Sequence, residues 1–173
     1  MSNSEIKGEF VLMMDELVQA VFRKDCRKAS GLDFANLAGT WVPQSAFNAY
    51  IDKLREHTEE FGPYIIGTKI IEMIDSMAPI KNDFPTLKDI VTNWDKVYLA
   101  NNRGADAGEY NVVEFDEEKG LAVAHVTSPL DEGFHMGVLE GAIRFYLRRK
   151  PKSEIVEKIS DTGKSVFRYT WRV

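Results

Sequence analysis

The apolar residues of this chain change their spacing part-way along the sequence, and this change limits the possible folds more than any other feature. Up to about residue 100 they recur every three or four positions, as in amphipathic helices. From about residue 101 they alternate with polar residues in short runs, as in half-buried strands. A helical half (1–100) followed by a strand-rich half (101–173) predicts a single α+β domain.

Four helices are expected in the first half. Their boundaries are predicted from residues that start or stop helices, namely Gly31, Pro43, Gly62-Pro63, Pro79 and Thr86. The first helix carries its apolar stripe from Ile6 to Val21, and the fourth begins after Thr86 as its N-cap.

A helix between two β-hairpins is expected in the second half. The predicted strands are Glu109 to Phe115, Leu121 to Thr127, Glu154 to Ile159 and Ser165 to Val173, and the predicted helix runs from Phe134 to Arg149. Two hairpins of this kind form a four-stranded antiparallel sheet, and we expect helices to cover one of its faces.

Composition excludes several classes of protein. Three histidines and one cysteine among 173 residues are too few for a zinc-finger or disulfide scaffold, so we expect no metal site. A net charge of -5 argues against nucleic acid as the partner. Membrane spans need about 20 apolar residues in a row, and no such run occurs. A lone thiol and a polar start of the chain without a signal-peptide pattern favour the cytoplasm. That thiol, Cys26, has basic neighbours, so it is either reactive or incidental.

The predicted fifth helix contains two glycines, Gly137 and Gly141, on one face. Each costs about 1 kcal/mol of helix stability relative to alanine, so a close approach should offset that cost. Tight packing of the helix on the sheet is one explanation, and a wall that faces a ligand is the other.

Three polar side chains near this helix are candidates for a site. His135 follows Phe134 at the helix start, where the helix dipole disfavours a cation, so a neutral ring would either bind a ligand or cap the helix. His125 shares a strand face with apolar residues, as a structural histidine or as a ligand. Glu157 alternates with Ile155 and Ile159, so it is either a buried carboxylate with a partner or lies on a wet edge strand.

The second half resembles the 4-vinyl reductase domain, a member of the superfamily that includes haem-nitric-oxide sensors and vesicle-tethering TRAPP subunits. The matching residues are Phe134, His135, Gly137 and Gly141 in the helix, Glu157 in the strand, Gly163 in the turn, and Phe167, Tyr169 and Trp171 in the last strand. The chain is similar also to a family of myxobacterial proteins of about this length.

The chain departs from that resemblance in two ways. The cysteines of the 4-vinyl reductase motif are replaced here, with Ile159 or Ser160 at the first position. Haem-binding relatives carry a Y-x-S-x-R motif for the propionates, which this sequence lacks. Neither thiol or metal chemistry nor a haem cofactor is therefore implied.

The resemblance implies a non-enzymatic sensory module that binds an apolar small molecule and acts through a protein partner as a homodimer. The ligand-binding residues expected on this basis are His135, Gly137, Gly141, His125, Glu157 and Phe134. One alternative is a ligand-free adaptor of the vesicle-tethering type. Another is an enzyme with His125, His135 and Glu157 as acid and base groups, which requires their side chains to converge in one cavity.

Overall fold

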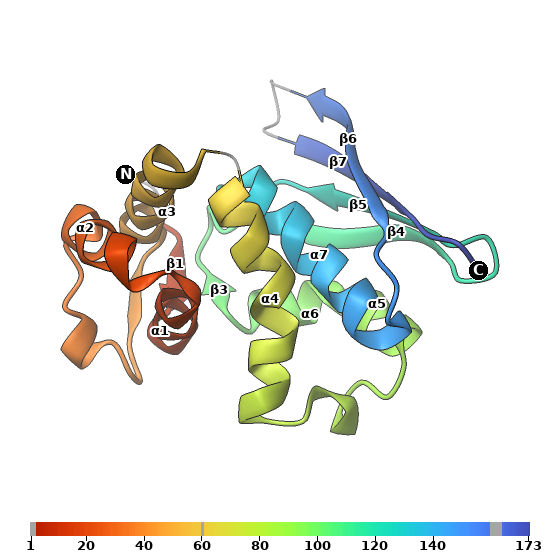
Figure 1. Ribbon diagram of the computed structural model, residues 1–173, viewed down its shortest axis with the longest axis horizontal. Coiled ribbons are helices and arrows are strands. Elements are labelled where there is room, and N and C mark those ends of the chain that lie inside the picture. Colours follow the sequence, from red (N-terminus) through yellow and green to blue (C-terminus); the bar gives the residue numbers. More distant parts are fainter. Residues whose placement is uncertain (1–2, 60, 160–163) are drawn as a thin grey trace.

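The computed structural model describes residues 3–59, 61–159 and 164–173. Its described part contains seven α-helices and two antiparallel sheets, so the α+β class predicted from the sequence is confirmed. In Figure 1 the first three helices and a small sheet form one side of the molecule. On the other side α4 and α7 run next to each other, and a four-stranded sheet lies against α7.

Six α-helices, rather than four, precede the first hairpin. The elements of this half are β1 (Glu5–Lys7), α1 (Gly8–Leu17), α2 (Ala20–Ser30), β2 (Trp41–Pro43), α3 (Gln44–Thr58), α4 (Phe61–Met77), α5 (Leu87–Thr92), α6 (Trp94–Leu99) and β3 (Asn102–Arg103), with 3-10 turns at Phe34–Asn36 and Ile80–Asn82.

Two of the predicted helices are interrupted. The first breaks after Leu17, where Val18 and Gln19 adopt extended backbone angles. The Arg23 guanidinium compensates for the break by donating to the carbonyl oxygen of Val18 at 2.9 Å. The predicted fourth helix divides at Asn93, which caps both α5 and α6.

Several predicted helix boundaries are correct, and one is wrong. Gly31 ends α2 in the left-handed conformation, and Thr86 forms a capping box with Asp89 at the start of α5. The predicted stop at Gly62-Pro63 is wrong, because α3 already ends at Thr58 and Pro63 lies in the first turn of α4. Proline fits there because a first-turn residue has no partner for its N–H within the helix.

The small sheet was not predicted from the sequence. Its strand order is β2-β1-β3, and β1 pairs antiparallel with both neighbours. These strands have only two or three residues each, too short for an alternating pattern to show. The sheet connects the start of the chain to the end of the helical half.

The second half has the predicted order of hairpin, helix and hairpin. Its elements are β4 (Tyr110–Asp116), β5 (Leu121–Val126), α7 (Glu132–Leu147), β6 (Lys152–Ile159) and β7 (Lys164–Thr170). The four-stranded sheet has the order β4-β5-β7-β6, which places β6 at an edge. The predicted turn at Gly163 lies outside the described residues.

The core lies between the four-stranded sheet and the helices. Ala122, Ala124 and Val126 of β5 and Phe167 and Tyr169 of β7 are all buried in it. Helix α7 packs closely against α4 and also contacts β6 and β7 (Figure 1). None of the described helices is long and apolar enough to span a lipid bilayer.

Candidate functional site

Helix α7 is positioned by its cap and by its two glycines. Its N-cap, Asp131, accepts a hydrogen bond from the Phe134 N–H at 2.7 Å. A Cβ atom on Gly141 would lie 2.6 Å from the carbonyl oxygen of Thr68 in α4, and one on Gly137 would overlap that of Tyr64. The glycines therefore allow α7 to pack closely against another helix. The sequence predicted either packing on the sheet or a wall that faces a ligand, whereas both glycines contact α4.

One side of α7 faces an internal cavity of about 50 Å³. Phe134, His135 and Val138 contribute to it from α7, and Phe10 and Ile70 contribute from the helical half. The Phe134 ring packs edge-on against Phe10, with ring centroids 6.2 Å apart. The two predicted residues Phe134 and His135 thus lie together at the junction of the two halves of the chain.

His135 is fully enclosed in this apolar environment. Its side chain packs edge-on against Tyr110 at a centroid distance of 5.0 Å, and the ring of Tyr98 lies 5.9 Å away. Burial lowers the pKa of His135 from 6.5 to about 3, so the ring is neutral at physiological pH, as predicted from the helix position. Its Nε2 atom has no hydrogen-bond partner among the described residues.

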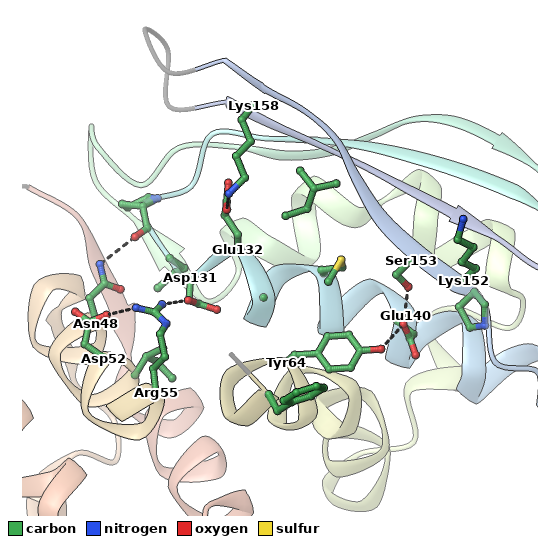
Figure 2. Close-up of a pocket in the computed structure, with 18 of the residues that line it drawn as sticks. Asn48, Asp52, Arg55, Tyr64, Asp131, Glu132, Glu140, Lys152, Ser153 and Lys158 are labelled. Carbon is green, nitrogen blue, oxygen red and sulfur yellow. Dashed lines mark hydrogen bonds and ion pairs between the residues drawn. The ribbon is translucent and has the colours of Figure 1, made fainter. Parts of the chain in front are cut away.

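The other side of α7 faces an open groove of about 920 Å³, which lies between α3, α4, α7 and β6. At one end Arg55 of α3 forms an ion pair with Asp131, and Asn48 donates to the Pro129 carbonyl at 3.0 Å (Figure 2). At the other end Tyr64 and Ser153 meet at a buried carboxylate. We call this space the α7 groove.

That carboxylate belongs to Glu140, which the sequence analysis did not select. It is only 1% exposed. Its Oε2 atom accepts hydrogen bonds from the Tyr64 hydroxyl at 2.6 Å and the Ser153 hydroxyl at 2.5 Å (Figure 2). A signal was present in the sequence, since Glu140 stands between Leu139 and Gly141 in the apolar stretch of the helix. Carboxylates are rarely buried without a structural or functional reason.

His125 and Glu157 lie away from both spaces. On β5 the buried face consists of Ala122, Ala124 and Val126, so His125 is on the opposite face of the sheet. Glu157 is exposed on the edge strand β6, next to an irregularity in the pairing with β7. Of the two alternatives for Glu157, the structure shows the wet edge strand and not the buried carboxylate.

The enzyme alternative loses its geometric basis for the same reason. It required His125, His135 and Glu157 to converge in one cavity, and only His135 lines the internal cavity. Cys26 is also unsuited to chemistry, because it is fully buried and this burial raises its pKa to about 11. A reactive thiol needs a lowered pKa and access to solvent.

Comparison with known proteins identifies the fold. No protein-family model and no curated protein matches the sequence. Solved structures do match over almost the whole length. One is an H-NOX structure used to probe haem distortion in that family, with a TM-score of 0.74, 16% identity, and coverage of 97% of this chain and 96% of that chain. The chain has the fold of an H-NOX domain.

Two further structures agree with this assignment. An oxygen-binding H-NOX domain related to soluble guanylate cyclases has a TM-score of 0.71 and 15% identity, and covers 97% of this chain and 96% of its own. A mutant of the T. tengcongensis H-NOX has a TM-score of 0.72 and 16% identity, with coverage of 97% and 98%. All three are H-NOX structures, so the narrower resemblance to 4-vinyl reductase domains stays a prediction.

Haem, which is named for the first of these structures, does not fit the internal cavity. Sites for cofactors and drug-sized molecules usually have volumes of about 300–1,000 Å³, and this cavity has about 50 Å³. None of its lining residues is lysine or arginine, so propionates would have no cationic partner there. Of the polar side chains that line the cavity, His135 has Nε2 free of a hydrogen bond to the described residues and could offer it to a metal, whereas the Tyr98 hydroxyl already donates to the Ala107 carbonyl at 2.6 Å.

Proposed function

We propose that this protein is a sensory module that binds a small molecule in the internal cavity beside His135. The observation that carries the proposal is the His135 ring, which is neutral, 3% exposed, and has no partner for Nε2 among the described residues. A buried polar atom without a hydrogen bond lowers the stability of the folded protein. A ligand that hydrogen-bonds to this atom removes that penalty, and this adds to its affinity.

The cavity limits the chemistry of this ligand. A volume of about 50 Å³ holds a molecule of only a few non-hydrogen atoms. The walls are mostly apolar, with side chains such as Ile70, Ile71 and Val138. We therefore infer a small neutral molecule with one polar atom directed at His135 and the remainder against these side chains.

The position of the cavity suggests how binding could be transmitted. Phe10, Ile70 and Ile71 line it from the helical half, whereas Tyr110 and His135 line it from the second half. A ligand that favours one spacing of these walls would shift the equilibrium between arrangements of the two halves. We propose that the module has no catalytic activity, and that it signals to a protein partner, as a homodimer formed through helices of the first half, in the cytoplasm.

Two probes test the cavity and the role of His135 separately. Xenon tests the space, because it binds in apolar cavities, and ethanol adds one hydroxyl for Nε2. In ¹H–¹⁵N correlation spectra we expect both probes to shift the amide signals of the cavity residues in a saturable way. In His135→Phe, xenon binding should persist and ethanol binding should weaken. Spectra unchanged by both probes in the wild-type protein would contradict the proposal.

One observation favours the adaptor alternative and also indicates where a dimer could form. Phe61 and Ile65 lie one helical turn apart on α4 and are 69% and 45% exposed. They border a shallow depression that Leu17 and Phe22 also line. Exposed apolar patches of this kind mark protein contacts. Light scattering should show a dimer that the pair Phe61→Ser and Ile65→Ser dissociates, and a wild-type monomer would argue against both the homodimer and this contact.

A further inference from the structure

Glu140 places a buried carboxylate, one oxygen of which lacks a hydrogen bond, at the wall of the α7 groove. The Tyr64 and Ser153 hydroxyls both donate to Oε2, so they fix the carboxylate from α4 and from β6 (Figure 2). The Oε1 atom is buried and has no hydrogen-bond partner among the described residues. Oxygens of a carboxylate accept hydrogen bonds and cannot donate them when ionised. The atom that completes this site must therefore be a donor.

A cation is the donor that best suits this oxygen. The Arg144 guanidinium lies 4.0 Å from Oε1, which is within ion-pair range and too far for a hydrogen bond, and its side chain is 47% exposed. Hydrogen bonds between an ionised donor and a carboxylate are roughly twice as strong as neutral ones. A ligand ammonium or amidinium could approach Oε1 more closely than Arg144 does.

Most other charges of the groove have partners. Arg55 pairs with Asp131, and Lys158 pairs with Glu132. Lys152 pairs with Glu154 at 3.1 Å. Asp131 and Glu132 thus have a partner on each oxygen and the exposed Asp52 pairs with Arg55, whereas Glu140 is a buried carboxylate with one oxygen that lacks a hydrogen bond.

The remainder of the groove determines the body of the ligand. Phe61, Met136 and Ile155 offer apolar surface, and a volume of about 920 Å³ suits a drug-sized molecule. Lys150 and Lys152 line the same space and would repel a second positive charge. We propose that the α7 groove binds an organic monocation, in which one ammonium or amidinium group donates to Glu140 Oε1 and an apolar body rests on these side chains.

This site is independent of the internal cavity. Glu140 and Met136 line the groove, whereas His135 and Val138 line the cavity on the other side of the helix. A chain that binds nothing beside His135 could still bind an amine beside Glu140.

A matched pair of probes tests the proposal. We would titrate the full chain with 2-phenylethylamine and with 2-phenylethanol, which has a similar shape and no charge, and follow the amide signals of Tyr64, Met136 and Ser153. The amine should bind saturably and the alcohol at least tenfold more weakly. Glu140→Gln should weaken the amine at least tenfold, while the control Asp52→Asn, a carboxylate in the same groove, should change its affinity less than twofold.

A second variant keeps the test decisive if Glu140→Gln fails to fold. Arg144→Gln removes the cation that lies 4.0 Å from Oε1 and should tighten amine binding two- to threefold. Equal binding of amine and alcohol, or unchanged affinity of the amine in both variants, would overturn the proposal. A wild-type protein without saturable shifts in the presence of millimolar amine would also overturn it.

Discussion

The two sides of α7 carry opposite chemistry, although their key residues are little more than one helical turn apart. His135 is a neutral ring in a small apolar cavity of about 50 Å³. Glu140 is a carboxylate at the edge of an open groove of about 920 Å³ that several lysines line. Both are buried polar side chains with one atom unpaired among the described residues. The difference shows that one helix can separate a small apolar cavity from a large groove lined by charged residues, provided that its own position is fixed.

The close contact of α7 with α4 should give the largest effect. In Gly137→Ala the new Cβ would overlap the Tyr64 carbonyl oxygen, and a backbone atom cannot move aside cheaply. We expect a loss of about 3 kcal/mol in the free energy of unfolding, despite the gain of about 1 kcal/mol in helix propensity. Urea unfolding followed by circular dichroism measures this loss.

A second glycine gives the control for that experiment. Gly31 has a φ of +66° and nothing within 4 Å of an added Cβ, so Gly31→Ala should cost only about 1–2 kcal/mol. If Gly137→Ala were as stable as the wild type, α7 and α4 would be less closely packed than described. The positions of the cavity and the groove on the two sides of α7 would then be wrong.

The second-largest effect should come from acid, which acts on His135 and lowers the stability of the fold. The pKa of His135 is about 3 in the folded protein and near 6.5 when the chain unfolds. Between these values the unfolded chain binds more protons, so stability falls as the pH is lowered. The loss is about 1.4 kcal/mol per pH unit at most, or up to about 3 kcal/mol from pH 6.5 to about pH 4.5.

His135→Phe isolates this contribution, because it keeps an aromatic ring and removes the titrating nitrogens. Urea unfolding at a series of pH values should show a shallower pH dependence for the variant than for the wild type. Equal slopes would mean that the ring of His135 is open to water, and the contrast between the two sides of α7 would disappear.

On the groove side of α7, the loss of one hydrogen bond to Glu140 should lower stability by a smaller amount. Tyr64→Phe leaves Glu140 Oε2 with Ser153 alone, and we expect a loss of about 1–2 kcal/mol, since the acceptor is a carboxylate. In Tyr146→Phe the lost hydrogen bond is to the Phe84 carbonyl, so a loss of about 1 kcal/mol is expected. Thermal melts of both variants compare them, and a larger loss in Tyr146→Phe would contradict the described hydrogen bond between Tyr64 and Glu140.

The smallest effect should come from the rim of the groove. Lys158 pairs with Glu132, but the two side chains are 61% and 38% exposed. Ion pairs in contact with water contribute little, so Lys158→Ala should change stability by less than about 0.5 kcal/mol. A loss above about 1 kcal/mol in the same melts would show that this ion pair is less exposed to water than its exposed fractions indicate.

The sequence predicted those parts of the fold that depend on local chemistry. The N-cap at Thr86, the helix end at Gly31 and the placement of α7 between two pairs of strands all follow from short-range patterns. The three-stranded sheet depends on partners far along the chain, and the break after Leu17 is compensated by the Arg23 side chain; periodicity reveals neither.

The candidate site could be predicted from the sequence only in part, because some of its contacts join distant elements. His135 and Phe134 were found because α7 starts at a clear boundary. His125 and Glu157 were linked to them because an alternating strand has two faces, and the sequence alone does not say which face meets the helix. Glu140 was missed because its partners, Tyr64 and Ser153, come from two other elements.

The small apolar cavity beside His135 is the central claim, and a titration with haemin tests it most directly. We expect no saturable one-to-one complex with a sharp Soret band, and the same weak, featureless absorption for wild type and His135→Phe, because about 50 Å³ cannot hold the macrocycle. A stoichiometric Soret band that His135→Phe abolishes would contradict the account and show that the interior opens to bind haem through this histidine.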